Sequence, residues 1–513
     1  MSTENATIPT HERSPLVEMF AIAAPTIATM ATYTVMQFFD GLMVSRIDPP
    51  SPVYIAAQGN GGMVSWIPIS FSVGLLGVIN TFVAQYFGRG EPRKGADYGW
   101  VGLWLSLILW LLLLPVVFVI PAVCGGFLGH EGQLLEYEVS YAQICLVGAV
   151  FTMIARGIAQ FFFGLHKAKI PLIAASVAVT VNIAANWVLI FGHFGAPALG
   201  IKGAAIGTII GGFCEMFVLM LVFLSPAYND KFGTRSEWKP KLRPILDIVK
   251  LGWPAGAMIT NEMICWGYLM TGLLPLAGKA AGEATGDLSG ESGEIHNAVG
   301  WIALRFMHVA FMPAVGMSIA LTAIIGRCMG MGRPDLAAKR TWLGLYLTVG
   351  YMGTCGLLMV IFRERAVGLF IDEGTDPEIA SRMIAIGGWV MVIASVFQVF
   401  DALGMAMTGS LRGAGDTVWP GVVSVVASWL FLVLGGHLMI EYYPKLGSLG
   451  PWSAAAGYII FVGGALFVRF LGGKWRTMKV IRHEDVPSLT QTGPDEDLTA
   501  SPDALSGVTP GSP

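Results

Sequence analysis

No charged side chain occurs between Pro49 and Gly88, and this uncharged segment constrains the fold more than any other feature of the chain. It is about twice as long as the ~20 apolar residues that cross a lipid bilayer as a helix. Over the whole chain, 54% of the residues are hydrophobic, 13% are charged, and the mean hydropathy is +0.65. Soluble domains carry roughly 25% charged residues. The composition therefore predicts a membrane protein and argues against a very apolar soluble enzyme.

Twelve apolar stretches predict twelve transmembrane helices and an all-α membrane protein. Most are far longer than the ~10 alternating residues of a barrel strand, and they are rich in glycine, which transmembrane helices tolerate. The stretches lie near residues 16–44, 58–87, 97–121, 137–163, 171–193, 203–225, 246–276, 299–329, 340–362, 381–409, 418–440 and 451–472.

The two halves of the chain repeat a short loop sequence. Gly88-Arg-Gly-Glu-Pro92 recurs 242 residues later as Gly330-Met-Gly-Arg-Pro334, which defines the loop offset. A second match pairs Pro25 with Pro254 and defines a shorter offset of 229, the proline offset. The two offsets differ by 13, so the second half has gained 13 residues between its matched proline and its matched loop. Six spans separate the two loops, which places both on one side of the membrane and predicts parallel repeats. A membrane protein that repeats its own half is most often a transporter, because two similar bundles can rock about a site held between them.

The distribution of Lys and Arg predicts the orientation. The loops after the even-numbered spans, with the segment after the last span, hold roughly three times as many basic residues as the other loops, and basic loops stay in the cytoplasm. We therefore expect a multi-pass protein of a bacterial plasma membrane (the inner membrane), with both termini in the cytoplasm. No cleaved signal peptide is expected, because no basic region precedes a short apolar run near the N-terminus.

The spans and loops predict five parts of the chain. Residues 277–296, rich in Gly and Glu, are expected to form an outer loop that accommodates the 13 extra residues. The acidic, Pro- and Ser-rich end of the chain is expected to be disordered. The parts are a cytoplasmic N-terminus (1–14), an N-lobe six-helix bundle (15–226), a cytoplasmic connector (227–244), a C-lobe six-helix bundle (245–473) and a cytoplasmic tail (474–513).

The sequence offers no candidate for catalysis or for a resident cofactor. It has no Walker A motif, no specific Ser/His/Asp arrangement and no CxxC pair among its six cysteines. We therefore expect no enzyme activity, no cofactor and no nucleic-acid partner. The expected partners are a small-molecule substrate and the lipid bilayer, and the chain is expected to act as a monomer.

Six charged residues lie well inside the predicted spans. Each costs roughly 2.5–3.5 kcal/mol at the centre of a membrane helix, so such groups normally face a partner or a wet cavity. The structural interpretation is pairing, for example a salt bridge from one of the two arginines to an acid. The functional interpretation is a binding or coupling site. The residues are Asp40, Arg156, Glu215, Glu262, Arg305 and Asp401.

Several motifs resemble the multidrug and toxic compound extrusion (MATE) family. Gln398-Val-Phe-Asp401-Ala, followed by Gly409-Ser-Leu-Arg-Gly-Ala-Gly-Asp416, looks like the tenth-helix signature of that family. Pro254, followed eight residues later by Glu262, is similar to its seventh-helix pattern, and Phe39-Asp40-Gly-Leu-Met-Val resembles the acidic end of its first helix. The likeness covers about residues 15–475, and the tenth-helix motif is its most specific part.

The resemblance implies a fold and an activity. The family fold is two six-helix bundles around a central V-shaped cavity, and its members are antiporters that exchange Na⁺ or H⁺ for organic, often cationic and amphiphilic, compounds. In the NorM-like branch, Glu262 and Asp401 match C-lobe acids implicated in cation coupling, and Asp40 matches the acid of the first helix. Two carboxylates suit Na⁺ as hard oxygen ligands, and they can instead carry protons, so both ions stay open.

The likeness to a second branch of the family is incomplete. That branch uses an Asn and an Asp four residues apart on the fifth helix, and here the two positions are Asn182 and Asn186. Thr208 matches the neighbouring position on the sixth helix. The missing carboxylate shifts the expected coupling site towards the C-lobe. Asn182, Asn186, Thr208, Gln37 and Gln398 are the candidates for lining the substrate cavity.

Two other classes of function remain open on sequence alone. A flippase for a lipid-linked precursor shares the broader superfamily fold, but it would be expected to have a basic cavity for phosphates, and Arg156 and Arg305 are the only interior bases found. A membrane-embedded enzyme would need polar residues clustered on one leaflet side, whereas the interior acids are spread over several helices.

Overall fold

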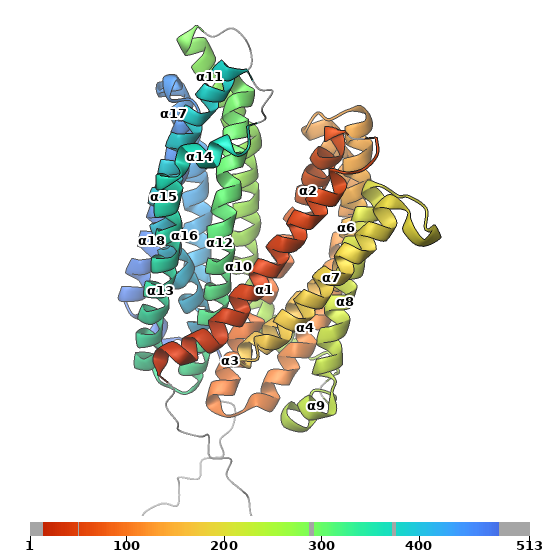
Figure 1. The fold of residues 1–513 in the computed structure, drawn as a ribbon. Coiled ribbons are helices and arrows are strands. Elements are labelled where there is room, and N and C mark those ends of the chain that lie inside the picture. The colour runs from red at the N-terminus through yellow and green to blue at the C-terminus, as the bar shows by residue number, and fades with distance from the viewer. Residues whose placement is uncertain (1–13, 50, 237, 287–291, 372–375, 482–513) are drawn as a thin grey trace, which may run out of the picture. The chain divides into compact units, whose positions relative to one another are not determined.

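The computed structural model describes residues 14–49, 51–236, 238–286, 292–371 and 376–481. The described residues up to Val480 form one compact unit. Within the described residues this unit consists of helices and connecting turns and contains no strand (Figure 1). The expected all-α fold is confirmed.

The helices of the first half cover the first six predicted spans. The second and third spans are each divided, the second at Gly77 between α2 and α3. The elements are α1 (Pro15–Val44), α2 (Pro52–Leu76), α3 (Ile79–Arg89), α4 (Pro92–Leu113), α5 (Val116–Pro121), the π-helix η1 (Ala122–Phe127), α6 (Gly132–Gly164), α7 (Lys169–Phe191), the 3₁₀ turn η2 (His193–Gly195), α8 (Ile201–Phe223) and α9 (Pro226–Phe232).

The second half follows the same order and adds two more π-helical segments, η3 and η4. Its elements are α10 (Leu242–Tyr268), η3 (Leu269–Leu273), α11 (Leu274–Thr285), α12 (Ser292–Gly330), α13 (Pro334–Ile361), α14 (Arg363–Gly368), α15 (Pro377–Ala414), α16 (Val418–Ala427), η4 (Ser428–Leu434), α17 (Gly435–Tyr442), the 3₁₀ turn η5 (Pro444–Leu446), α18 (Leu449–Leu471) and the 3₁₀ turn η6 (Lys474–Thr477).

Eleven helices in the described part of the chain are long and apolar enough to cross a membrane. The twelfth expected span, near residues 246–276, is formed by α10 and η3. The 27 residues of α10 give a length of ~40 Å at 1.5 Å per residue, which is enough to cross a bilayer. Asp247, Lys250 and Glu262 make this helix more polar than the others. The fold is therefore twelve membrane helices in two six-helix bundles.

The two repeated loops pack against each other. A β-carbon added at Gly88 would collide with the backbone carbonyl of Arg327, and one added at Gly330 would collide with the carbonyl of Gln85. The two glycines are related by the loop offset, and so are the two residues that they contact. Glycine permits this close approach because it has no β-carbon. The loops lie on the same side of the protein, so the predicted parallel repeat is confirmed.

A second pair of contacts between the halves repeats in the same way. The β-carbon position of Gly74 lies 2.8 Å from Cα of Gly256, and that of Gly316 lies 2.7 Å from Cα of Ile27. Gly74 and Gly316 are related by the loop offset, whereas Ile27 and Gly256 are related by the proline offset. These contacts support both offsets found in the sequence, because each half places equivalent positions against the other.

The first helix of each half begins against the opposite half. Near the start of α1, Glu18 forms an ion pair of 2.6 Å with Arg340 of α13, and Met19 packs into a core cluster of the C-lobe. Near the start of α10, Asp247 accepts a hydrogen bond of 3.4 Å from the hydroxyl of Tyr98 on α4. Glu18 corresponds to Asp247 at the proline offset, and Tyr98 corresponds to Arg340 at the loop offset. One contact is ionic and the other is a hydrogen bond.

The prediction of an outer loop at residues 277–296 is wrong at 277–285 and 292–296, which are helical, whereas 287–291 lie outside the described residues. The helix α11 continues to Thr285, and α12 begins at Ser292. Ala, Leu, Lys and Glu are strong helix formers and outnumber the glycines of α11. Gly278 has a further role, since a β-carbon there would lie 2.6 Å from the carbonyl oxygen of Ser292, so the glycine lets α11 pack closely on α12.

Candidate functional site

Asp40 lies in a buried polar cluster of the N-lobe. Its side chain is 7% exposed, near the end of α1. The side-chain amide of Asn186 on α7 donates a hydrogen bond of 2.6 Å to Asp40 Oδ1. Asn182, one turn earlier on α7, accepts from the Asn186 amide at 3.5 Å, and its own amide nitrogen is buried without a hydrogen-bond partner among the described residues. The structure therefore brings together three residues that the sequence singled out.

Two glycines of α8 make room for these asparagines. A β-carbon at Gly207 would overlap the side-chain oxygen of Asn186, and one at Gly211 would lie 2.9 Å from Cβ of Asn182. Thr208, between them, donates to the carbonyl of Ala204 in its own helix. It lies on the correct helix, but its hydroxyl is occupied by the preceding turn rather than by Asp40.

The second cluster lies in the C-lobe, around Glu262 of α10 and Asp401 of α15. Both carboxylates are half-buried, and they are close enough to interact electrostatically. The side chain of Tyr458 on α18 neighbours Glu262 and is almost fully buried. The predicted pair of C-lobe acids is therefore assembled, and Tyr458 is an addition that the sequence did not reveal.

A π-helical segment supports the Glu262 side of this cluster. Asn261, adjacent to Glu262, donates from its side-chain amide to Ser428 Oγ at 2.6 Å and accepts from the indole N–H of Trp429 at 2.7 Å. Ser428 and Trp429 open the π-helix η4. Such one-turn π segments occur frequently at functional sites.

The two predicted glutamines differ in their surroundings. Gln37 is exposed, one turn before Asp40. Gln398 is buried one turn before Asp401, and its amide nitrogen lies 3.9 Å from the sulfur of Met359. Gln398 therefore belongs to the packed side of α15, although it is only one helical turn from Asp401 in the sequence.

A third cluster, in the N-lobe, joins Tyr33, Arg156 and Glu215. The Tyr33 hydroxyl donates a hydrogen bond to Glu215 Oε1. The guanidinium carbon of Arg156 lies 3.7 Å from the centre of the Tyr33 ring. Arg156 thus contacts an aromatic ring instead of forming the salt bridge considered from the sequence. The same holds for Arg305, whose guanidinium carbon lies 5.4 Å from the centre of the Phe370 ring.

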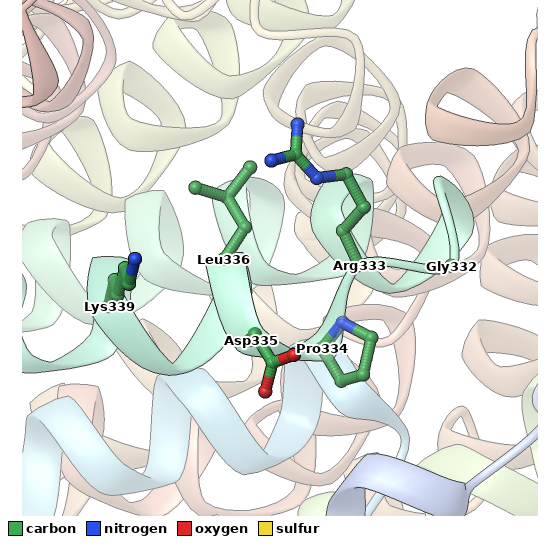
Figure 2. A pocket seen from close by; sticks show the side chains of 6 residues that line it. All are labelled: Gly332, Arg333, Pro334, Asp335, Leu336 and Lys339. Carbon is green, nitrogen blue, oxygen red and sulfur yellow. The ribbon is translucent and has the colours of Figure 1, made fainter.

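A small surface hollow lies apart from these clusters, at the start of α13. Its volume is about 240 Å³, and Arg333 and Lys339 line it beside Asp335 (Figure 2). Figure 2 shows Asp335 pointing away from Arg333. The hollow contains none of the candidate site residues.

A family model matches parts of both halves of the chain. The MatE family model matches residues 25–188 and 287–436, which is more than half of the chain. The chain belongs to the MatE family. The matched regions contain Asp40 and both asparagines in the first half and Asp401 in the second. MatE proteins are transporters, and this chain is accordingly a multi-pass membrane transporter and not an enzyme.

Individual relatives extend the match over most of the chain. A probable multidrug resistance protein NorM of Thermotoga maritima is 27% identical over 409 residues, which cover 79% of this chain and 82% of the relative. A protein of the same name from Pseudomonas aeruginosa is 28% identical over 488 residues, which cover 91% of each chain. A third, from Mesorhizobium japonicum, is 25% identical and covers 90% of this chain and 94% of its own.

Solved structures share the MatE fold. A transporter of the MOP superfamily from Pyrococcus furiosus superposes with a TM-score of 0.76 and 20% identity, over 90% of this chain and 97% of that chain. A eukaryotic MATE transporter superposes with a TM-score of 0.75 and 17% identity, over 90% and 96%. At these identities the match establishes the fold.

Two side chains of these clusters, Tyr33 and Tyr458, were not predicted from the sequence. Tyr33 is related to Glu262 by the proline offset, so the repeat itself could have pointed to it. Tyr458 gives no such signal, because the chain contains 13 tyrosines and no spacing distinguishes this one.

Proposed function

We propose that this MatE protein is a secondary active antiporter that exports organic, cationic amphiphilic compounds in exchange for Na⁺ or H⁺. One observation carries the proposal: Glu262 on α10 and Asp401 on α15 are two half-buried acids on neighbouring parts of the same lobe, inside membrane helices. Acids inside a membrane bundle normally mark an ion or substrate pathway. The relatives named as multidrug resistance proteins support an organic substrate.

The exchange follows from the shared negative charge. Two carboxylates near one another repel, and a bound cation or a pair of protons relieves that repulsion. An organic cation is attracted by the same charge, so its binding and that of the coupling cation oppose each other. Coupling of this sign is what antiport requires. Asp40, which accepts a hydrogen bond from Asn186, assists from the N-lobe.

Na⁺ and H⁺ would use the C-lobe cluster differently. Na⁺ would take oxygen ligands from both carboxylates, with the Tyr458 hydroxyl as a further neutral oxygen. The described residues include no group of three or more His, Cys, Asp or Glu side chains that could hold a metal ion, so Na⁺ would need such neutral ligands. Protons would need only the carboxylates.

The proposed orientation places the two Gly-x-Gly loops and both termini in the cytoplasm of a bacterial cell. The basic residues of these loops and of the connector support it. In this orientation, the helix starts that cross between the halves lie on the cytoplasmic side. The protein acts as a monomer, with the substrate bound between the lobes.

The test is transport by purified protein in proteoliposomes. A fluorescent organic cation is loaded, and its movement is followed under an imposed Na⁺ gradient or an imposed pH gradient. One of the two gradients is expected to drive accumulation against the concentration gradient of the dye. Movement that ignores both gradients would contradict antiport, and transbilayer movement of a pyrophosphate-linked lipid would assign the flippase function instead. The contacts of Arg156 and Arg305 favour the antiporter over the flippase, because both guanidinium groups pack against aromatic rings instead of forming a basic site for a phosphate.

A further inference from the structure

The first and last helices of each half carry a Tyr/Glu pair, with the two residue types exchanged. In the N-lobe, Tyr33 on α1 donates to Glu215 on α8. In the C-lobe, Glu262 on α10 neighbours Tyr458 on α18. Tyr33 and Glu262 occupy equivalent positions, because they are related by the proline offset that also relates α1 to α10.

The last helices also align closely. Gly200 before α8 and Gly447 before α18 have nearly the same backbone angles, with φ of 54° and 53° and ψ of −128° and −135°. This match gives an offset of 247 between α8 and α18. At this offset Tyr458 is equivalent to Gly211, and Glu215 lies one helical turn after Gly211 on the same face of α8. The same two helix surfaces therefore meet through a tyrosine and a glutamate in both lobes.

The third helix in contact with the pair differs in charge between the lobes. Gly164 at the end of α6 packs on the carbonyl of Asn80, and Gly413 of α15 packs on the carbonyl of Thr322. Asn80 and Thr322 are related by the loop offset, so the two glycines are equivalent. They set an offset of 249 between α6 and α15. At this offset, Arg156 is equivalent to Met405. The position of Asp401 is equivalent to Thr152.

The charges of the two clusters differ accordingly. Glu262 and Asp401 give the C-lobe pair two acids. Glu215 gives the N-lobe pair one acid, and Arg156 brings a positive charge onto the ring of Tyr33. Guanidinium stays protonated in proteins, and it is attracted to the face of an aromatic ring. Arg156 Nε is buried and has no hydrogen-bond partner among the described residues.

We propose that Arg156 is a tethered cation that fills the N-lobe Tyr33–Glu215 site, and that removing it opens this site to a free monovalent cation. The tethered guanidinium makes the N-lobe Tyr/Glu pair unavailable to exchangeable cations, so that of the two Tyr/Glu pairs only the C-lobe pair takes part in exchange. The claim about which pair takes part in exchange rests on the proposed function, whereas the cation site at Glu215 does not depend on it. Its ligand would be a small cation that fits against a tyrosine face and a carboxylate, of which guanidinium is the nearest free analogue.

The experiment is chemical rescue of purified full-length protein. Arg156→Ala removes the tethered cation and leaves space for a free one. Methylguanidinium at millimolar concentration is expected to raise the melting temperature of Arg156→Ala saturably, by about 2–4 °C. Wild type and the matched control Arg156→Lys, which keeps a tethered charge, should show no such shift. Arg156→Ala/Glu215→Gln, which lacks the carboxylate, should lose the effect.

Each outcome decides the proposal. A folded Arg156→Ala protein that shows no saturable response to methylguanidinium or Na⁺ would overturn it, as would an equal response in Arg156→Ala/Glu215→Gln. If Arg156→Ala does not yield folded protein, the double variant should be recovered in better yield, because it removes both charges, and a double variant no better than the single contradicts the proposal. Repeating the rescue in a Glu262→Gln/Asp401→Asn background separates the two claims, since the N-lobe response should persist whether or not the C-lobe acids couple transport.

Discussion

The two halves agree where their backbones meet and differ where their interior charges lie. Gly88 and Gly330 make equivalent contacts with the opposite half, and so do Gly74 and Gly316. Deeper in the bundles, Tyr33 replaces Glu262 and Arg156 replaces Met405. Backbone packing tolerates few substitutions, because any side chain at the contact glycines would collide. Interior side chains have no such restriction, so the repeat has kept its framework while its two polar sites have diverged.

The largest expected effect comes from breaking the framework. Gly88→Ala or Gly330→Ala places a β-carbon onto a backbone carbonyl of the other half, which cannot move as a flexible side chain would. We expect each to destabilise the protein by about 3 kcal/mol or to prevent folding. Gly350→Ala is the control, because that helical glycine has nothing within 4 Å of its β-carbon position. The yield and melting temperature of the detergent-solubilised protein give the readout, and near-normal Gly88→Ala protein would refute the contact.

The next effect concerns activity. Asp401→Asn and Glu262→Gln are each expected to abolish gradient-driven export while leaving the protein folded, because amide and acid have nearly equal volumes. Arg305→Lys should cost less, since Arg305 contacts an aromatic ring away from the acids. Export in drug-sensitive cells, with expression and melting temperature measured in parallel, checks this prediction. A stable Asp401→Asn protein that exports normally would exclude the residue from coupling.

A smaller effect is expected at the Asp40 cluster. Asn186→Leu removes the amide that donates to Asp40 and leaves the buried carboxylate without that hydrogen bond. The cost should be about 1–3 kcal/mol in stability. Thr180→Val on the same helix is the matched control, because that exposed threonine hydroxyl donates within its own helix turn. Thermal unfolding followed by tryptophan fluorescence would show it, and equal stability losses in both variants would argue against a specific role for Asn186.

The smallest effect is expected where the framework itself differs. Glu18→Gln breaks the ion pair with Arg340, and Tyr98→Phe breaks the equivalent hydrogen bond with Asp247. We expect a loss of about 1 kcal/mol for the first and less for the second, because the Glu18–Arg340 contact is shorter and charged on both sides. The difference should shrink in high salt, which screens the ion pair. A larger loss in Tyr98→Phe would reverse this ranking.

The sequence predicted the framework because long apolar stretches and repeated glycines directly reflect membrane spans and close helix contacts. It failed at residues 277–285, where glycine content suggested a loop but the remaining residues favour α11. It identified Asp40, Glu262 and Asp401, because interior acids are rare and resemble a family pattern. It could not identify Tyr458, since aromatic side chains are common in membrane helices. The contact of Arg156 with Tyr33 depends on how α1 and α6 pack, which no local pattern encodes.

The central claim is that one framework holds two different Tyr/Glu sites and that, of these two, only the C-lobe site couples cation movement to export. The most direct test compares two neutralised variants in the same proteoliposomes: Glu262→Gln/Asp401→Asn in the C-lobe and Arg156→Met/Glu215→Gln in the N-lobe. Gradient-driven transport of a fluorescent organic cation is measured for both. We expect the C-lobe variant to lose it and the N-lobe variant to retain it. Retained coupling in the C-lobe variant, or its loss from a stable N-lobe variant, would contradict the account.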